Sequence, residues 1–81
     1  MIYRIYTEDI NRNKIEAAAN NLFDGFTLIP AIGYWKGIKE NSIIIEIFTT
    51  DVDSVFSLAD QIKEFNNQEA VLVVSVFTRE P

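Results

Sequence analysis

The segment Ser42-Ile43-Ile44-Ile45-Glu46-Ile47-Phe48-Thr49 carries the strongest structural signal in this chain of 81 residues. Four isoleucines lie between positions 43 and 47. Their β-branched side chains favour a strand, and their near-continuous run indicates one that is covered on both faces. The segment therefore predicts a central strand. Because successive side chains of a strand alternate, Glu46 shares its face with Ile44 and Phe48.

Three other segments also have strand character. Residues 2–7 alternate, and residues 70–78 are dominated by valine. Residues 26–35 form a long extended stretch that contains Pro30. Proline has no N–H to donate to a neighbouring strand, so this third segment is predicted at the edge of a sheet. Residues 36–41 are polar and predict a turn before the central strand.

A first helix is predicted over residues 11–22. Its apolar residues recur at helical spacing, and Asp9 or Asn11 is the candidate N-cap. The Asp24-Gly25 pair is expected to end it, with the glycine in the left-handed conformation that follows many helices.

A second helix is predicted to begin at Thr50 or Asp51 and to stop at the Asn66-Asn67 pair. Its apolar face consists of Val52, Val55, Ala59 and Ile62.

The element order is therefore β-α-β-β-α-β within one domain, residues 1–81. This order predicts a ferredoxin-like α+β fold, with two helices on one face of a four-stranded, antiparallel-type sheet. Right-handed crossovers place the strands of residues 2–7 and 42–49 side by side at its centre.

The face of the sheet that carries Arg4, Glu46 and Ser75 is predicted to stay open, while the face without charges packs on the helices. Because that open face remains largely apolar, a covering partner is expected, most simply further copies of the chain. The residues predicted at this oligomer interface are Ile2, Arg4, Tyr6, Tyr34, Trp35, Ile44, Glu46, Phe48, Val71, Val73 and Phe77.

Arg4 and Glu46 lie on the two central strands of the predicted open face. We hypothesise that they form a salt bridge, which specifies strand register more surely than it adds stability. The alternative is two unrelated charges at a solvated rim.

Composition excludes several classes of function. The chain has no cysteine and no histidine, so disulfides, thiolate zinc sites, imidazole bases and cysteine nucleophiles are absent. A net charge of −5 argues against nucleic acid and anionic membrane as partners. No glycine-rich phosphate loop and no activated serine appear, so the sequence predicts neither an enzyme nor a bound cofactor. Without a basic leader or a long apolar run, the chain is expected to be cytoplasmic.

Two groups of residues are candidates for binding. Asp51 and Asp53 offer carboxylates to a hard cation, and so do Glu8 and Asp9 at the first helix. Acidic residues at a helix N-terminus are more often caps, so no metal site is predicted. Tyr34, Trp35 and Lys36 offer an aromatic and cationic site for a base or a phosphate; the alternative for these residues is packing against a neighbouring subunit.

The hairpin itself resembles a known family. Tyr34-Trp35-Lys36-Gly37-Ile38-Lys39-Glu40 and the strand that follows are similar to the central hairpin of the CutA divalent-cation-tolerance family, in the PII-like group of trimeric ferredoxin-like proteins. The Tyr6-Thr7 end of the first strand also matches, and Asn67-Gln68-Glu69-Ala70-Val71 is a weakened form of the family's last loop.

The resemblance implies a homotrimer in which the hairpins reach neighbouring subunits. It also implies that Lys39 and Glu69 join Trp35 and Lys36 in a ligand-binding cleft. The family's cysteine and histidine positions have no counterpart here, so its metal-binding role is not carried over. The function expected is a non-enzymatic sensor or store of a small ligand or ion at subunit clefts. The alternative is a structural module that docks another protein through its apolar sheet face.

Overall fold

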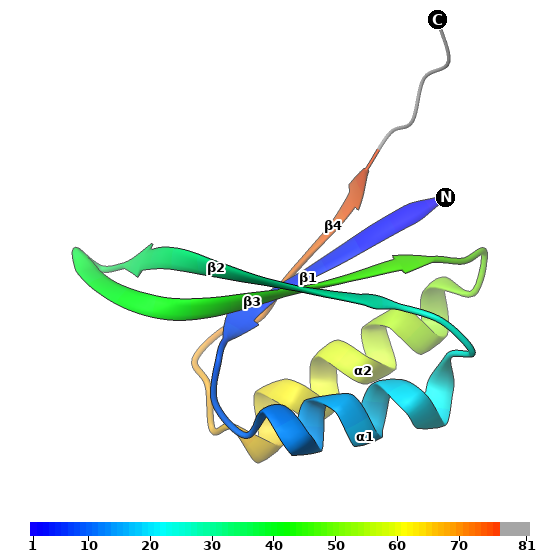
Figure 1. Cartoon of the computed structure of the whole chain (residues 1–81), viewed down its shortest axis with the longest axis horizontal. Helices are drawn as coiled ribbons and strands as arrows, with labels where there is room; N and C mark the ends of the chain where they lie inside the picture. The colour runs from blue at the N-terminus through cyan, green and yellow to red at the C-terminus, as the bar shows by residue number, and fades with distance from the viewer. Residues whose placement is uncertain (77–81) are drawn as a thin grey trace, which may run out of the picture.

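The structure is a computed structural model that describes residues 1–76. The order of its strands and helices confirms the predicted ferredoxin-like fold (Figure 1). The elements are β1 (Ile2–Glu8), α1 (Arg12–Leu22), β2 (Thr27–Trp35), β3 (Ile38–Phe48), α2 (Val52–Phe65) and β4 (Leu72–Val76). The strands form one antiparallel sheet in the order β2-β3-β1-β4, and both helices lie against the same face of it.

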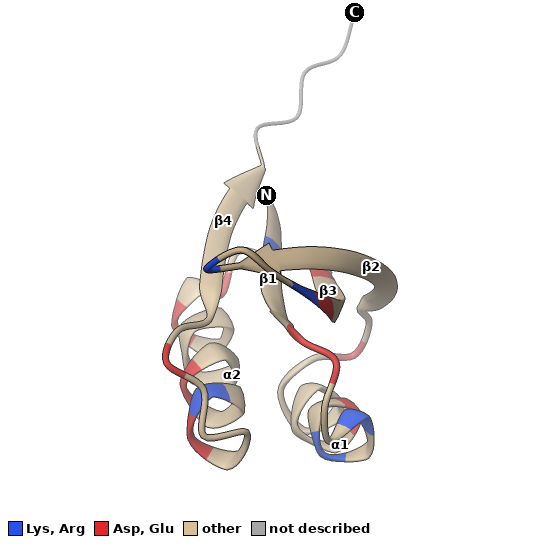
Figure 2. Cartoon of the chain, turned by 90° about the vertical axis from the view of Figure 1, so that its left-hand side faces the viewer, with Lys and Arg blue, Asp and Glu red and all other residues tan. Residues whose placement is uncertain are grey.

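The core lies between the sheet and the helices. Ile5, Ile43, Ile45 and Ile47 point from the two central strands toward the helices, and each is fully buried. The helices contribute the remaining buried hydrophobic residues, Ile15, Ala18, Ala19, Val55, Leu58, Ala59 and Ile62. Figure 2 shows the two helices side by side beneath a sheet that carries few charges. The alternation that the sequence predicted for β1 and β3 is therefore the one that builds the core.

The β2–β3 hairpin turns more tightly than the sequence predicted. Its turn consists of Lys36 and Gly37 alone, with φ of 51° and 78°, and β3 begins at Ile38 instead of Ser42. Two consecutive residues with positive φ are the signature of the hairpin turn whose twist matches that of paired strands. Pro30 lies in β2, an edge strand, as predicted.

The helix ends differ in how they are capped. Asp51 caps α2 as predicted, since its carboxylate accepts hydrogen bonds from the backbone N–H of Ser54 at 3.1 Å and from its hydroxyl at 2.6 Å. Asn11 stands at the N-cap position of α1 but makes no side-chain cap. The predicted left-handed Gly25 is wrong, because α1 passes into extended backbone at Phe23 and only Gly37 has positive φ among the described glycines.

The predicted faces of the last strand are also wrong. Val73 pairs with Ile5 and packs with Val71 against the core, so neither lies on the open face as proposed. Leu72, Val74 and Val76 lie there instead, opposite Tyr6, Arg4 and Ile2. Ser75 is opposite Tyr3, on the helix side of the sheet, yet it stays exposed. Figure 1 gives the reason: this end of β4 runs past the helices, so a polar side chain there meets solvent. Phe77 lies outside the described residues.

The open face keeps large apolar side chains in contact with solvent. Phe48 is 78% exposed, Ile38 70% and Leu72 59%. Arg4 and Glu46 are cross-strand partners on the two central strands of this face, and Nε of Arg4 lies 2.8 Å from Oε2 of Glu46. The predicted salt bridge is therefore confirmed, and the hydrogen bond to Glu46 raises the pKa of the Arg4 guanidinium above its usual value.

None of the helices in residues 1–76 is both long enough and apolar enough to cross a membrane.

Candidate functional site

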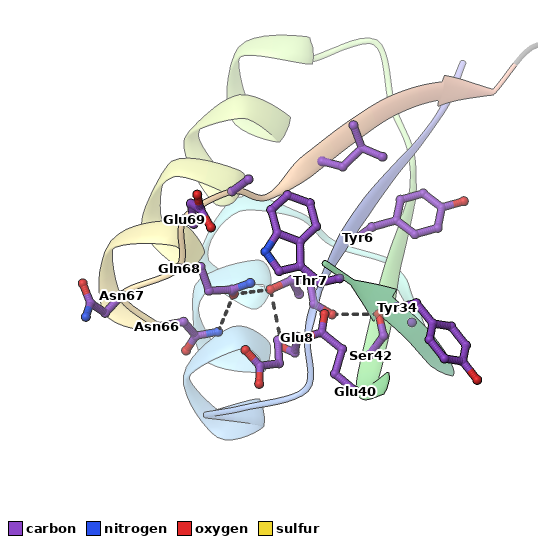
Figure 3. A pocket seen from close by; sticks show the side chains of 14 residues that line it. Tyr6, Thr7, Glu8, Tyr34, Glu40, Ser42, Asn66, Asn67, Gln68 and Glu69 are labelled. Atoms are coloured by element: carbon purple, nitrogen blue, oxygen red, sulfur yellow. Dashed lines mark hydrogen bonds between the residues drawn. The ribbon is translucent and has the colours of Figure 1, made fainter. Parts of the chain in front are cut away.

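A cavity of about 400 Å³ lies where three segments distant in sequence meet (Figure 3). These segments are the end of β1, the β2–β3 hairpin and the loop that joins α2 to β4. The lining residues are Tyr6, Thr7, Glu8, Gly33, Tyr34, Trp35, Glu40, Ser42, Asn66, Asn67, Gln68, Glu69, Ala70 and Leu72. Aromatic, amide, hydroxyl and carboxylate groups are all present, and this mixture is typical of small-molecule sites.

The α2–β4 loop is fixed by a network of side-chain hydrogen bonds. The hydroxyl of Thr7 and the amide nitrogen of Asn66 both donate to Oε1 of Gln68, the latter at 3.1 Å. Asn11 donates to Oδ1 of Asn66 at 2.8 Å, which connects the start of α1 to the same network. Thr7 and Asn66 are the buried polar residues of the described chain, and both are fully partnered. These hydrogen bonds hold this wall of the cavity in place without a ligand.

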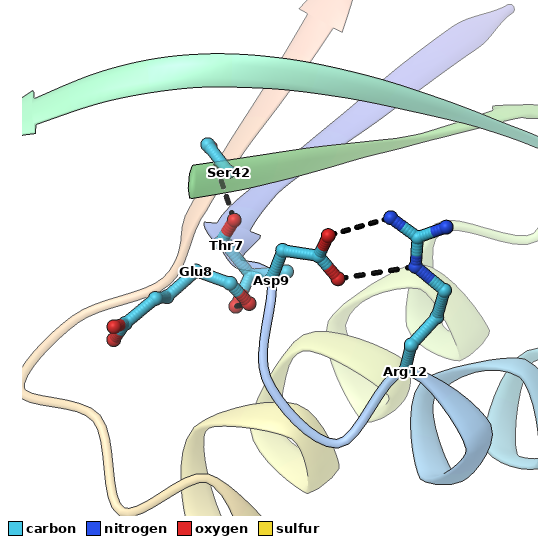
Figure 4. A network of polar contacts seen from close by, with 5 residues as sticks. All are labelled: Thr7, Glu8, Asp9, Arg12 and Ser42. Atoms are coloured by element: carbon cyan, nitrogen blue, oxygen red, sulfur yellow. Dashed lines mark hydrogen bonds and ion pairs between the residues drawn. The ribbon is translucent and has the colours of Figure 1, made fainter. Parts of the chain in front are cut away.

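The end of β1 is held by two further contacts (Figure 4). The hydroxyl of Ser42 donates to the backbone carbonyl of Thr7 at 3.0 Å, which ties β3 to β1 at the cavity. Arg12 donates hydrogen bonds to both carboxylate oxygens of Asp9, and its Nε lies 3.1 Å from Oδ1. This contact raises the pKa of Arg12 and fixes the connection between β1 and α1. Glu8, which precedes Asp9, lines the cavity.

Lys36, at the tip of the hairpin, reaches across to the α2–β4 loop. Its ammonium lies 3.0 Å from Oε1 of Glu69 and 5.9 Å from the ring centre of Trp35. Both side chains of the ion pair are about two-thirds exposed, so the contact contributes little to stability. It shows that the hairpin and the loop approach each other closely.

The lining of the cavity is acidic. Glu8, Glu40 and Glu69 line it, and no lining residue in the described chain is Lys or Arg. Carboxylates of this kind do not by themselves make a metal site: no three acidic, cysteine or histidine side chains within residues 1–76 converge on a point where an ion would sit. The negative charge is therefore distributed along the wall.

The structure brings together three of the four residues predicted to bind ligand. Trp35 and Glu69 line the cavity, and Lys36 contacts both of them. Lys39 does not line it; it stands opposite Tyr34 in the hairpin ladder.

The residues predicted at an oligomer interface divide into two sets. Those on the open face and the hairpin are partly or largely exposed in the single chain, whereas Val71 and Val73 are partly buried and pack against the core on the opposite side of the sheet. The accessible ones are Ile2, Arg4, Tyr6, Tyr34, Trp35, Ile44, Glu46 and Phe48.

Sequence reasoning missed most of the polar lining. Glu8, with Asp9, was weighed as a cation ligand or as a helix cap, and Asn66 only as a stop signal. Glu40 was assigned to a turn, although it continues β3. The run Asn66-Asn67-Gln68-Glu69 could have indicated a polar site. It has four consecutive polar residues, which is more than the end of a helix requires.

Comparisons with known proteins show the fold. No model of a known protein family matches the sequence, and no curated protein matches it. Among solved structures, the chain is similar to CPII, a nitrogen regulatory PII-like protein from Thiomonas intermedia K12 bound to ADP, AMP and bicarbonate; the TM-score is 0.67 at 15% identity, over 99% of this chain and 92% of that one.

Two more structures are similar. One is a Thermus thermophilus protein described as PII-like and signalling, with a TM-score of 0.61 at 19% identity over 90% of this chain and 78% of that one. The other is the de novo designed protein Foldit4, with a TM-score of 0.58 at 15% identity over 96% of this chain and 94% of that one. A designed protein shares the fold with signalling proteins, so the fold alone assigns no function.

Proposed function

We propose that the chain is a non-enzymatic, homotrimeric protein of the PII-like kind that binds a small ligand in the cavity between its hairpin and the α2–β4 loop. The observation that carries this proposal is the cavity itself. It has a rigid polar wall built on Thr7, Asn66 and Gln68, and an aromatic and charged rim at Trp35 and Glu69. Its volume of about 400 Å³ lies within the range of small-molecule sites.

The open sheet face supports assembly. Phe48 and Ile38 expose more than two-thirds of their surface, and Phe48 and Ile2 border a hollow of about 320 Å³. Exposed apolar side chains beside a hollow form a surface that another subunit can cover. The hairpin supports the same idea, since Tyr34 and Trp35 are 72% and 48% exposed, and aromatic residues are enriched at subunit interfaces.

The similar structures add a functional analogy. CPII was solved with nucleotides and bicarbonate bound, so a protein of this architecture has been seen to hold small ligands. Within the PII-like group, the hairpin residues Tyr34 to Glu40 suggest the CutA branch.

Light scattering after size exclusion tests the assembly, and ligand titrations test the site. The expected mass is three times the 9.3 kDa of the chain. The only tryptophan of the chain, Trp35, lines the cavity, so its fluorescence reports occupancy directly. A monomer whose tryptophan responds to none of a panel of nucleotides, amino acids, amines and divalent cations would refute the proposal. That result would leave the apolar sheet face as a docking surface for another protein.

A further inference from the structure

We infer that the ligand of this cavity is a small organic cation, an aliphatic amine of one or more amino groups. This inference rests on the proposed function and names the ligand class of the same site. It departs from the analogy with CPII, which holds anionic nucleotides.

The first argument is the charge of the wall. Glu8, Glu40 and Glu69 line the cavity without a lining lysine or arginine in the described chain. In Figure 3, Glu69 lies on the α2–β4 loop, apart from Glu8 and Glu40, which come from β1 and β3. The carboxylates of this lining attract a cation and repel a phosphate.

The second argument is that the site already holds an ammonium group. The Lys36 ammonium lies 3.0 Å from a carboxylate oxygen of Glu69 and 5.9 Å from the centre of the Trp35 ring. A carboxylate together with an indole face is a recognised set of partners for an alkylammonium ion, through charge and cation–π attraction. The Lys36 side chain therefore shows that an alkylammonium group fits at the rim of the cavity. An incoming amine has the same two partners available, and it competes there with Lys36.

The third argument separates an organic cation from a metal ion. Mg²⁺ and Ca²⁺ need several oxygen ligands that converge at about 2.0–2.6 Å from one point. No such convergence of acidic side chains exists within residues 1–76. Separated carboxylates instead match a cation whose charges are spread along a flexible chain. Tyr6 and Trp35 supply apolar surface for the methylene groups between those charges.

The one lysine at the rim does not favour an anion. Lys36 is bound to Glu69, so a phosphate would have to break that ion pair and then sit beside the freed carboxylate. Elsewhere in residues 1–76, Arg4 and Arg12 are also engaged with carboxylates. The net charge of −5 adds a long-range repulsion against anions.

Titration of Trp35 fluorescence with spermidine and with AMP tests the inference, at about 0.1 M ionic strength, where screening beyond about 10 Å suppresses the general attraction of an acidic surface. Spermidine is expected to bind and AMP is not. Glu40→Gln should weaken spermidine binding about fivefold, the factor that one charge pair at contact distance is worth in bulk water. Lys36→Met should strengthen it, because the internal competitor for Glu69 is removed.

The control is Asp53→Asn, which removes the same charge from the first turn of α2, far along the helix from the loop that lines the cavity. It should leave spermidine binding unchanged. An equal loss in Asp53→Asn and Glu40→Gln would show non-specific attraction and overturn the inference. AMP binding that weakens in Lys36→Met would also overturn it, while leaving the proposed ligand-binding trimer in place. A protein of trimeric mass that binds neither probe would overturn the inference alone.

Discussion

Phe48 offers the sharpest test of the open sheet face. It is the last residue of β3 and is 78% exposed in the single chain. A phenylalanine side chain presents about 200 Å², so complete coverage by a neighbour would remove about 150 Å² from water and contribute about 4 kcal/mol per subunit. That amount corresponds to about a thousandfold in a dissociation constant. An aspartate at this position would lose this contribution and also bring an unpaired carboxylate into the contact.

The matched control is Phe56→Asp. Phe56 is 52% exposed on α2, which covers the opposite face of the sheet. Both variants replace an exposed phenylalanine by the same charged residue, so they differ in the face that is changed.

Light scattering after size exclusion is the assay, over a range of protein concentrations from about 0.1 to 100 µM, which spans the thousandfold change expected in the dissociation constant. Phe48→Asp should elute as a 9.3 kDa monomer, whereas Phe56→Asp should keep the wild-type mass. An unchanged mass in Phe48→Asp would refute the assignment of this face to the interface. So would dissociation in both variants, since that result would point to a general loss of stability.

Two further predictions concern the stability of the chain. Gly37→Ala should destabilise the fold by about 1–2 kcal/mol in urea unfolding, because an alanine Cβ is disfavoured at its φ of 78°, whereas Gly25→Ala, which meets no neighbouring atom and has no positive φ, should be neutral or slightly stabilising. Equal losses in both would contradict the turn geometry. The hydrogen bonds from Ser54 lower the pKa of Asp51, so its stabilising effect is complete above the ordinary carboxyl pKa and disappears as the pH falls through the lowered value. The difference in thermal midpoint between wild type and Asp51→Ala should therefore shrink on acidification, and a difference that stays constant down to about pH 2 would count against the cap.

The sequence was sufficient for the fold because its local signals agree with one another. The isoleucines at 43, 45 and 47 identify a strand that must be buried, and their alternation with Glu46 predicts which face packs on the helices. Pro30 restricts its strand to an edge. Arg4 was correctly paired with Glu46 from the strand order alone, since strand neighbours follow once the crossovers are fixed.

The last strand shows where local pattern stops being informative. Residues 71–74 are all apolar, so alternation gives no preference for either face, and Ser75 was taken as the marker of the open side. Its face is set by the register with β1, which places Val73 beside Ile5. Ser75 lies opposite Tyr3 on the helix side and is nevertheless exposed, because burial at this position depends on how the layers assemble and not on the pattern of the strand.

The cavity was decided by tertiary structure for a similar reason. Glu8, Glu40 and Glu69 are separated by about thirty residues each, and no local pattern relates them. They line one space because the tight Lys36-Gly37 turn lengthens the hairpin and brings its tip to the α2–β4 loop. The sequence thus determined the elements, the sheet order and the buried faces, since short-range periodicity and sterics specify these. The shared site followed only from the curvature and register of the folded sheet, which depend on every strand at once.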